Sequence, residues 1–124
     1  MPLQVPGFLL RRLYVRGSLR RTDDGFQLEL KNTLGSGYAR RLLPLQVNGV
    51  QIPLASCFFE VEGVRRAFAD VTPDSPFSLA LNRTSLLGGQ GTSLPDGVVE
   101  VTIGFEVQGL GELSFSVKDT PASD

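Results

Sequence analysis

Histidine is absent from the 124-residue chain, and cysteine occurs only once. The absence of histidine removes the commonest general acid or base near neutral pH and the commonest metal ligand. It also excludes a Ser–His or Cys–His nucleophile pair and the usual zinc sites. Carboxylates and two lysines, Lys31 and Lys118, remain for proton transfer. The sequence therefore predicts that the chain alone is not a catalyst and that it holds no metal or other cofactor.

Long apolar runs are also absent: none approaches the roughly 20 residues of a membrane span. The opening residues, MPLQVPGFLLRR, place a basic pair after the apolar stretch, which is the reverse of a secretory signal. A pI near 5.4 and scattered arginines do not form the electrostatic footprint of a nucleic-acid-binding protein. We therefore expect a cytoplasmic protein that binds neither membranes nor nucleic acid.

The composition is that of one folded domain. Apolar residues make up 41% of the chain and charged residues 20%, which are ordinary values. Fourteen glycines and eight prolines fit many short strands joined by tight turns. We predict a single β-sandwich domain over residues 1–119 and a disordered tail over residues 120–124.

Alternation of apolar and polar side chains predicts strands along most of the chain. The clearest strand follows the turn at Asp23-Asp24-Gly25 and places Phe26 and Leu28 on one face. Further strands are expected at residues 13–21, 57–61, 77–81, 99–107 and 113–117, while residues 64–71 could form a strand or one helical turn. Residues 86–97 are rich in glycine and are predicted to form a mobile surface loop that could reach a partner. The fold class is all-β, an antiparallel two-sheet β-sandwich of about eight strands, favoured over a closed barrel.

A hairpin with a defined register is predicted around Asn48-Gly49, a pair typical of the two-residue type I′ turn. This register places six apolar side chains on one buried face, those of Leu43, Leu45, Val47, Val50, Ile52 and Leu54. It also sets Pro44 opposite Pro53, which excludes a further ladder neighbour at that level. We expect the hairpin to cap a sheet edge or to project as an arm.

Charge is distributed unevenly. Residues 1–41 contain eight basic and three acidic side chains, whereas residues 84–124 contain one basic and six acidic side chains. These regions could neutralise each other across neighbouring strands, or the basic region could bind a partner protein. Tyrosine and arginine are enriched at interface hot spots. The partner-binding candidates are therefore the Arg/Tyr stripe of the expected first strand and a nearby arginine pair: Arg12, Tyr14, Arg16, Arg20, Arg40 and Arg41.

Other candidate sites have simpler explanations. Asp23-Asp24 supplies too few oxygens for calcium and fits a hairpin turn. The run Gly88-Gly89-Gln90-Gly91 lacks the lysine and the following helix of a phosphate-binding loop. Cys57 lies in an apolar strand without a nearby base and is predicted to be a buried small hydrophobe.

Several motifs resemble the β subunit of bacterial C-glycoside deglycosidases. They are the run LYVRGSLRRT at residues 13–22, Gly25-Phe26 and Lys31-Asn32 after it, the Val-Asn-Gly-Val hairpin and the closing strand GELSFSVKD. The resemblance implies a small, non-catalytic β subunit of a heteromeric lyase that acts in flavonoid glycoside catabolism. Its partner would be a TIM-barrel α subunit, similar to sugar-phosphate isomerases, with a divalent metal, commonly manganese. That α subunit would cleave the C–C bond between a 3-oxo sugar and an aromatic aglycone.

The alternative is a stand-alone β-sandwich module that binds a carbohydrate or another protein. Carbohydrate-binding sandwiches usually present exposed aromatic platforms, and this chain has no tryptophan and only two tyrosines. The composition therefore disfavours a carbohydrate-binding module.

Overall fold

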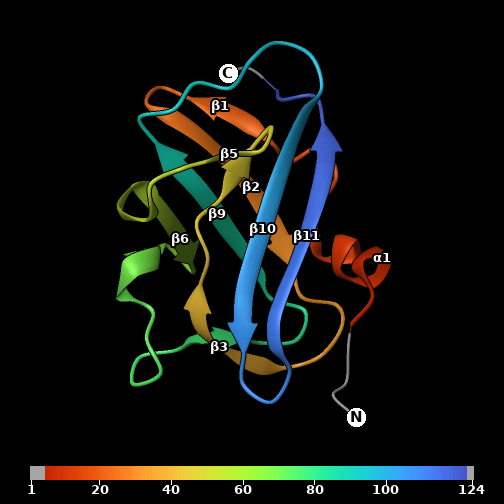
Figure 1. Cartoon of the computed structure of the whole chain (residues 1–124), viewed down its shortest axis with the longest axis vertical. Helices are drawn as coiled ribbons and strands as arrows, with labels where there is room; N and C mark the ends of the chain where they lie inside the picture. Colours follow the sequence, from red (N-terminus) through yellow and green to blue (C-terminus); the bar gives the residue numbers. More distant parts are fainter. Residues whose placement is uncertain (1–4, 123–124) are drawn as a thin grey trace.

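Two antiparallel β-sheets packed face to face form the body of the computed structural model, which describes residues 5–122 (Figure 1). The first sheet has the order β1-β2-β9-β6-β7 and contains β1 (Arg20–Thr22), β2 (Gly25–Lys31), β6 (Cys57–Val61), β7 (Val64–Ala67) and β9 (Thr84–Gln90). The second has the order β5-β4-β10-β3-β8, with β11 also paired to β10, and contains β3 (Gly37–Leu42), β4 (Gln46–Val47), β5 (Val50–Gln51), β8 (Phe77–Leu79), β10 (Val99–Val107) and β11 (Gly111–Asp119). The predicted all-β two-sheet sandwich is confirmed.

Helical segments within residues 5–122 are short. They are α1 (Gly7–Leu10) and three 3-10 turns, η1 (Arg11–Leu13), η2 (Leu54–Ser56) and η3 (Phe68–Asp70). None of the helices in this part of the chain is long and apolar enough to cross a bilayer. The open choice at residues 64–71 resolves into both alternatives, because β7 is followed directly by η3.

The core lies between the two sheets and is centred on β10. Its alternate side chains from Val99 to Val107 are buried, and it pairs with β11 along its whole length. From the first sheet, Phe26 and Leu28 are fully buried, as the alternation predicted. Phe59 of β6 stacks on Phe77 of β8 with ring centroids 4.4 Å apart. This aromatic contact joins the two layers.

The mobile loop predicted over residues 86–97 is wrong for its first part, which belongs to a central strand. β9 pairs with β2 on one side and with β6 on the other. A Cβ on Gly88 would lie 2.5 Å from the carbonyl oxygen of Phe26 and 2.6 Å from the ring of Phe58. Gly88 and its buried neighbour Gly89 therefore allow a close approach of backbone and aromatic rings. The clustered glycines reflect this packing and do not mark a loop.

The hairpin at Asn48-Gly49 is confirmed at its tip. Both turn residues have positive φ, 50° and 81°, and Val47 pairs with Val50. The buried-face prediction is wrong for Val50, which is 67% exposed, because its side of β5 has no covering layer. Leu45, Val47 and Ile52 are buried as predicted.

Pairing within this hairpin does not reach Leu43 and Leu54. Leu54 begins η2, and the amide of Leu43 donates instead to the carbonyl of Gly104 at 2.9 Å. Pro44 lies in the break between β3 and β4, and both of these strands pair with β10. β5 caps the sheet edge as predicted. The hairpin is not a projecting arm, because β4 has β10 as its second neighbour.

The strand predicted from residue 13 begins only at Arg20. The preceding residues form α1 and η1, whose Leu10 and Leu13 are three positions apart and are both buried. Gly17 then turns the chain with φ 86°. The polar stripe expected along a first strand is therefore not formed.

Part of the predicted disordered tail is ordered. Ala122 forms a parallel bridge with Arg20, and its amide donates to the carbonyl of Leu19 at 2.9 Å. The amide of Arg21 donates to the carbonyl of Ala122, also at 2.9 Å. Residues 120–122 thus continue from β11 to the edge of the first sheet beside β1. Residues 123–124 of the predicted tail lie outside the described residues.

Candidate functional site

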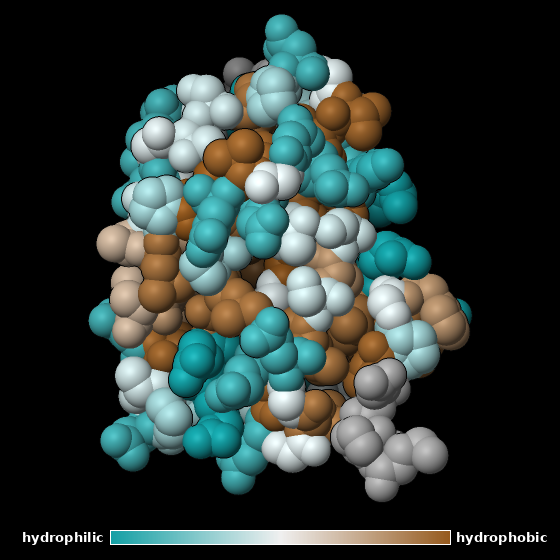
Figure 2. Space-filling model, viewed as in Figure 1, coloured by the Kyte–Doolittle hydropathy of each residue, from teal (hydrophilic) through white to brown (hydrophobic). Residues whose placement is uncertain are grey.

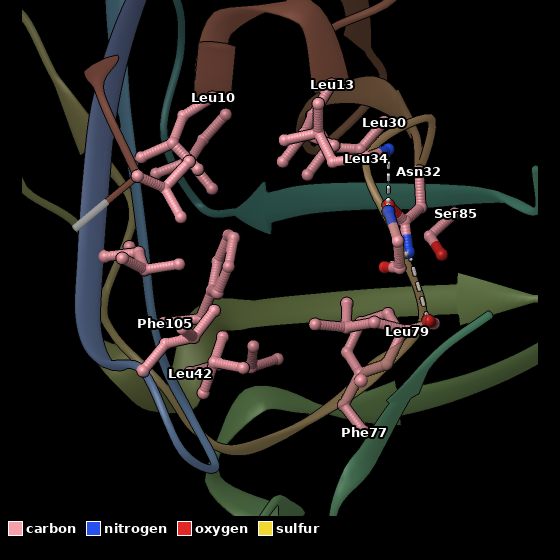
Figure 3. Close-up of a pocket in the computed structure, with 18 of the residues that line it drawn as sticks. Leu10, Leu13, Leu30, Asn32, Leu34, Leu42, Phe77, Leu79, Ser85 and Phe105 are labelled. Atoms are coloured by element: carbon pink, nitrogen blue, oxygen red, sulfur yellow. Dashed lines mark hydrogen bonds between the residues drawn. The ribbon is translucent and has the colours of Figure 1, made fainter. Parts of the chain in front are cut away.

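An apolar chamber of about 390 Å³ lies between the sheets, at the side where α1 and η1 pack. Figure 3 shows Leu10 and Leu13 pointing into it from the helical segment, with Leu42 and Phe105 on one wall and Phe77 and Leu79 at the base. α1 contacts β11, and Tyr14 at the end of η1 bridges to Leu30 of β2. The helical segment therefore closes the sandwich here in place of a strand. In Figure 2, apolar side chains are visible on the face of the molecule next to this segment.

The size of the chamber indicates that it is not a sealed and empty void. A sealed and empty apolar void of 390 Å³ would cost about 9 kcal/mol at about 24 cal/mol per Å³. That cost equals the whole stability of a typical domain. The chamber instead opens at its rim, where Leu34 is 42% exposed and Gly35 and Ser36 are exposed. Solvent or a ligand can enter by this route.

The side chains that line the chamber are mostly apolar. Ten leucines and three phenylalanines line the chamber, and Arg83 is its one charged lining residue among residues 5–122. The neutral polar side chains of the lining are those of Asn32, Ser36 and Ser85. This combination of a large apolar surface with a few polar groups is typical of small-molecule sites.

Asn32 holds the rim loop in place. Its Nδ2 donates to the carbonyl oxygens of Gly35 at 2.7 Å and Leu79 at 3.0 Å. Its Oδ1 accepts from the amides of Leu34 at 3.2 Å and Gly35 at 3.3 Å. These bonds tie the loop after β2 to β8 (Figure 3). The amide of Asn32 is engaged in the architecture and is not available to a ligand.

Arg83 differs from Asn32 because part of its hydrogen-bonding capacity is unused. Its Nη2 donates to the carbonyl of Ser78, while its Nε is buried without a hydrogen-bond partner in the described part of the chain. A buried donor without a partner is costly. The guanidinium therefore places a positive charge beside an apolar space.

Tyr14, a predicted partner-binding residue, is buried and makes an internal contact. Its hydroxyl donates to Oδ2 of Asp119 at 2.7 Å. Burial, together with this bond, raises the pKa of Tyr14 to about 12. Burial also tends to raise the pKa of Asp119. Hydrogen bonds from Tyr14 and from two backbone amides, together with the nearby charge of Arg16, outweigh that effect and lower this pKa.

The other predicted residues do not converge on one surface. Arg12 and Arg16 are exposed near α1, and Arg16 and Tyr14 border a polar depression together with Arg11, Glu100 and Lys118. Arg20 is exposed on β1, which belongs to the other sheet from β3, and β1 and β3 lie at opposite ends of the sandwich in Figure 1. Partner binding by these residues stays a prediction.

Arg40 and Arg41 are both exposed although they are neighbours in β3. Ala39 pairs with Val107 and Arg41 pairs with Glu106, so one extra residue is inserted in β3. Such a bulge turns two successive side chains to the same side of the strand. The arginine pair therefore lies on the solvent side of the second sheet.

The remaining candidates have structural roles. Cys57 is buried as predicted, and burial raises the pKa of its thiol. Asp23 and Asp24 form the turn between β1 and β2. Within residues 5–122, no group of three or more His, Cys, Asp or Glu side chains could hold a metal ion.

Sequence reasoning missed the chamber and Arg83. A cavity is a volume that no side chain fills, so it produces no periodic pattern in the sequence. The available signal was Arg83 itself, an isolated charge between the apolar residues of β8 and those of β9. That signal alone does not distinguish a chamber from an exposed loop.

Comparison with known proteins identifies a different family from the one that the motifs suggested. The family model described as the hydroxymethylglutaryl-CoA reductase N-terminal domain matches residues 9–121. None of the curated proteins matches the chain. The assignment to C-glycoside deglycosidase β subunits was therefore wrong, together with the lyase activity and the flavonoid glycoside substrate. The motifs that suggested it lie mainly in turns and strands. They specify architecture and include no catalytic residue. The chain belongs to the family of hydroxymethylglutaryl-CoA reductase N-terminal domains.

Proposed function

We propose that this chain is a non-catalytic domain of an enzyme of the hydroxymethylglutaryl-CoA reductase type, and that it acts by binding the catalytic unit. The family match over residues 9–121 carries the proposal. The family is named for the N-terminal domain of a reductase. The binding sites for hydroxymethylglutaryl-CoA and for the hydride donor then lie in the catalytic unit.

The displaced pKa values support a non-catalytic role. Within residues 5–122 they belong to Tyr14, Cys57 and Asp119. The raised values keep the phenol and the thiol protonated, and thiolate is the reactive form of cysteine. The lowered value makes the carboxylate a poor proton acceptor at neutral pH. All three shifts therefore reduce reactivity, whereas the pKa values of catalytic groups are shifted in the direction that their reaction needs.

The surface around α1 is the best candidate for the contact. Phe8 on α1 is 61% exposed, and Arg12 follows it four residues later. Arg16 is exposed close by, after η1. Exposed aromatic and arginine side chains are the residues that most often dominate binding energy at interfaces. We call Phe8, Arg12 and Arg16 the α1 surface.

Co-expression tests the proposal. The tagged full chain is produced with the hydroxymethylglutaryl-CoA reductase catalytic unit of the same genome and analysed by size-exclusion chromatography with light scattering. We expect one co-eluting complex at micromolar concentration. Purified alone, the chain should not reduce hydroxymethylglutaryl-CoA when either reduced nicotinamide cofactor is supplied.

Two sets of substitutions locate the contact. Phe8→Ser with Arg12→Ala and Arg16→Ala should weaken the complex at least tenfold, whereas Arg40→Ala with Arg41→Ala on the bulge of β3 should leave it unchanged. Separate elution of the unaltered proteins, or turnover by the chain alone, would contradict the proposed function. Loss of binding only in the β3 variant would place the contact on the β3 surface instead.

A further inference from the structure

We infer that the chamber is a binding site for a small amphipathic carboxylate, with an aliphatic body between the sheets and its carboxylate against Arg83. The inference is independent of the proposed reductase association, since it depends only on the chamber and its rim. Its volume of about 390 Å³ falls within the range of ligand pockets. A cavity that holds only one or two waters needs far less space.

Arg83 selects the head group. It is the one charged side chain of the lining among residues 5–122, and its guanidinium is a positively charged donor of hydrogen bonds. No carboxylate of the described residues lines the chamber, so the positive charge is not neutralised within it. A ligand carboxylate supplies the opposite charge and can accept charge-assisted hydrogen bonds from the guanidinium. Such charge-assisted bonds are about twice as strong as neutral ones.

The walls select the body of the ligand. Leucines outnumber phenylalanines ten to three in the lining, and the amide of Asn32 is already occupied by the rim loop. Ser36 Oγ likewise accepts a hydrogen bond from the amide of Leu81. Ser85 is the one neutral polar side chain that is left in the described part of the lining, so a sugar or a nucleotide would lose more hydrogen bonds with water than it gains. A flexible alkyl chain has no hydrogen bonds with water to lose, and it fits a lining of leucine side chains.

Calorimetric titration of the purified full chain with octanoate, decanoate and dodecanoate, all below their micellar concentrations, tests the inference. We expect saturable binding of at least one of them at one site per chain. Matched ten-carbon probes then isolate the head group: 1-decanol should bind at least tenfold more weakly than decanoate, and decylamine should bind more weakly still. Amide chemical shifts of Leu10, Leu79 and Phe105, which border the chamber in Figure 3, should change on binding.

Two variants test separately how the carboxylate and the alkyl chain of the ligand contribute to affinity. Arg83→Gln should weaken decanoate binding roughly tenfold to a hundredfold, as loss of a hydrogen bond to a charged group implies, and should leave 1-decanol unchanged. Leu79→Phe, which fills the base of the chamber, should weaken both probes. Arg40→Gln on β3 is the control for loss of an exposed arginine and should weaken neither. Thermal denaturation confirms that each variant is folded.

Three results would overturn the inference. They are no saturable binding of any of the carboxylates, equal affinity for decanoate and decylamine, or unchanged decanoate affinity in folded Arg83→Gln. The first two need only the unaltered chain, so they hold even if a variant fails to fold. None involves the catalytic unit, which keeps this test separate from that of the proposed function.

Discussion

The Tyr14 hydroxyl and the Asp119 carboxylate are joined by a 2.7 Å hydrogen bond between residues 105 positions apart in the sequence. The amides of Gly17 and Thr120 donate to the same carboxylate, each at 2.8 Å. Tyr14 follows η1, and Asp119 ends β11. The bond therefore fastens the helical segment that walls the chamber to the edge of the second sheet.

Removing the phenol hydroxyl should loosen this attachment. Tyr14→Phe leaves a partly buried carboxylate with one donor fewer, and we expect a loss of about 1–3 kcal/mol in the free energy of unfolding. Urea denaturation followed by circular dichroism measures it. Tyr38→Phe is the control, because Tyr38 is 54% exposed and its change should lie within about 0.5 kcal/mol. Equal stability of the two variants would show that the Tyr14–Asp119 bond does not stabilise the fold.

Asp119 should contribute to the loss of folding stability at acidic pH. Its pKa is lowered in the fold, so its contribution is present above the pKa of the unfolded chain and is lost as pH falls through the folded value. The unfolded reference is about 4. Asp119→Asn should therefore reduce stability at pH 7 and flatten the decline below about pH 4. Melting temperatures measured from pH 2 to pH 7 test this expectation, and an unchanged decline at acidic pH in Asp119→Asn would contradict it.

Tyr14 should act at the opposite end of the pH range. Its pKa is raised to about 12, above the ordinary value near 10. Its contribution to stability is therefore complete below pH 10 and is lost as pH rises through 12. Phenolate absorbance near 295 nm, measured in Tyr38→Phe so that Tyr14 is the one tyrosine left, should show Tyr14 titrating near pH 12 in the native protein. Titration of Tyr14 near pH 10 in that folded variant would argue against the buried hydrogen bond.

Gly88 should not tolerate a side chain. A Cβ there would lie 2.5 Å from the Phe26 carbonyl oxygen and 2.6 Å from the Phe58 ring, and both neighbours belong to adjacent strands. We expect Gly88→Ala to cost about 1–3 kcal/mol or more through overpacking. Gly37→Ala is the matched control in β3, because its Cβ would meet only Val107 at 3.7 Å. Chemical denaturation of both variants compares them, and equal losses would refute the close approach.

Val47 and Val50 flank the same turn but differ in burial. Val47 is 6% exposed and Val50 is 67% exposed. Val47→Ala should cost on the order of 1–2 kcal/mol from lost apolar burial, whereas Val50→Ala should cost much less. Thermal melts of the two variants test which face of the hairpin the core covers. Similar losses would indicate that both valines are buried.

Sequence patterns predicted the parts of the fold in which local signals agree with tertiary packing. The alternation of β10 and of β2 and the turn at Asn48-Gly49 are examples, since a strand with one buried face shows its period directly. β9 was missed because Gly88 and Gly89 are packing residues in a central strand. The helical segment before Tyr14 was missed because α1 and η1 are single turns of different helix types, each too short to show a helical period.

The candidate site was less accessible to prediction. Arg40 and Arg41 share a side only because of a bulge, which the alternation of residues does not reveal. Tyr14 was expected on a surface, yet its partner Asp119 lies far away in sequence, and no local rule connects them. The chamber is lined by segments that lie far apart in the sequence, from α1 to β11. Only the assembled layers show such a space.

The position of β9 has a consequence for how the chain folds. Both of its neighbours, β2 and β6, are distant in sequence, so the first sheet cannot grow by adding one hairpin after another. Long loops must close before β9 gains its hydrogen bonds, and their entropy is lost before any ladder compensates for it. Topologies of this kind fold on the order of milliseconds to seconds. During that interval β2 and β6 expose unpaired edges, so the rate of folding should set how readily the chain aggregates at high concentration.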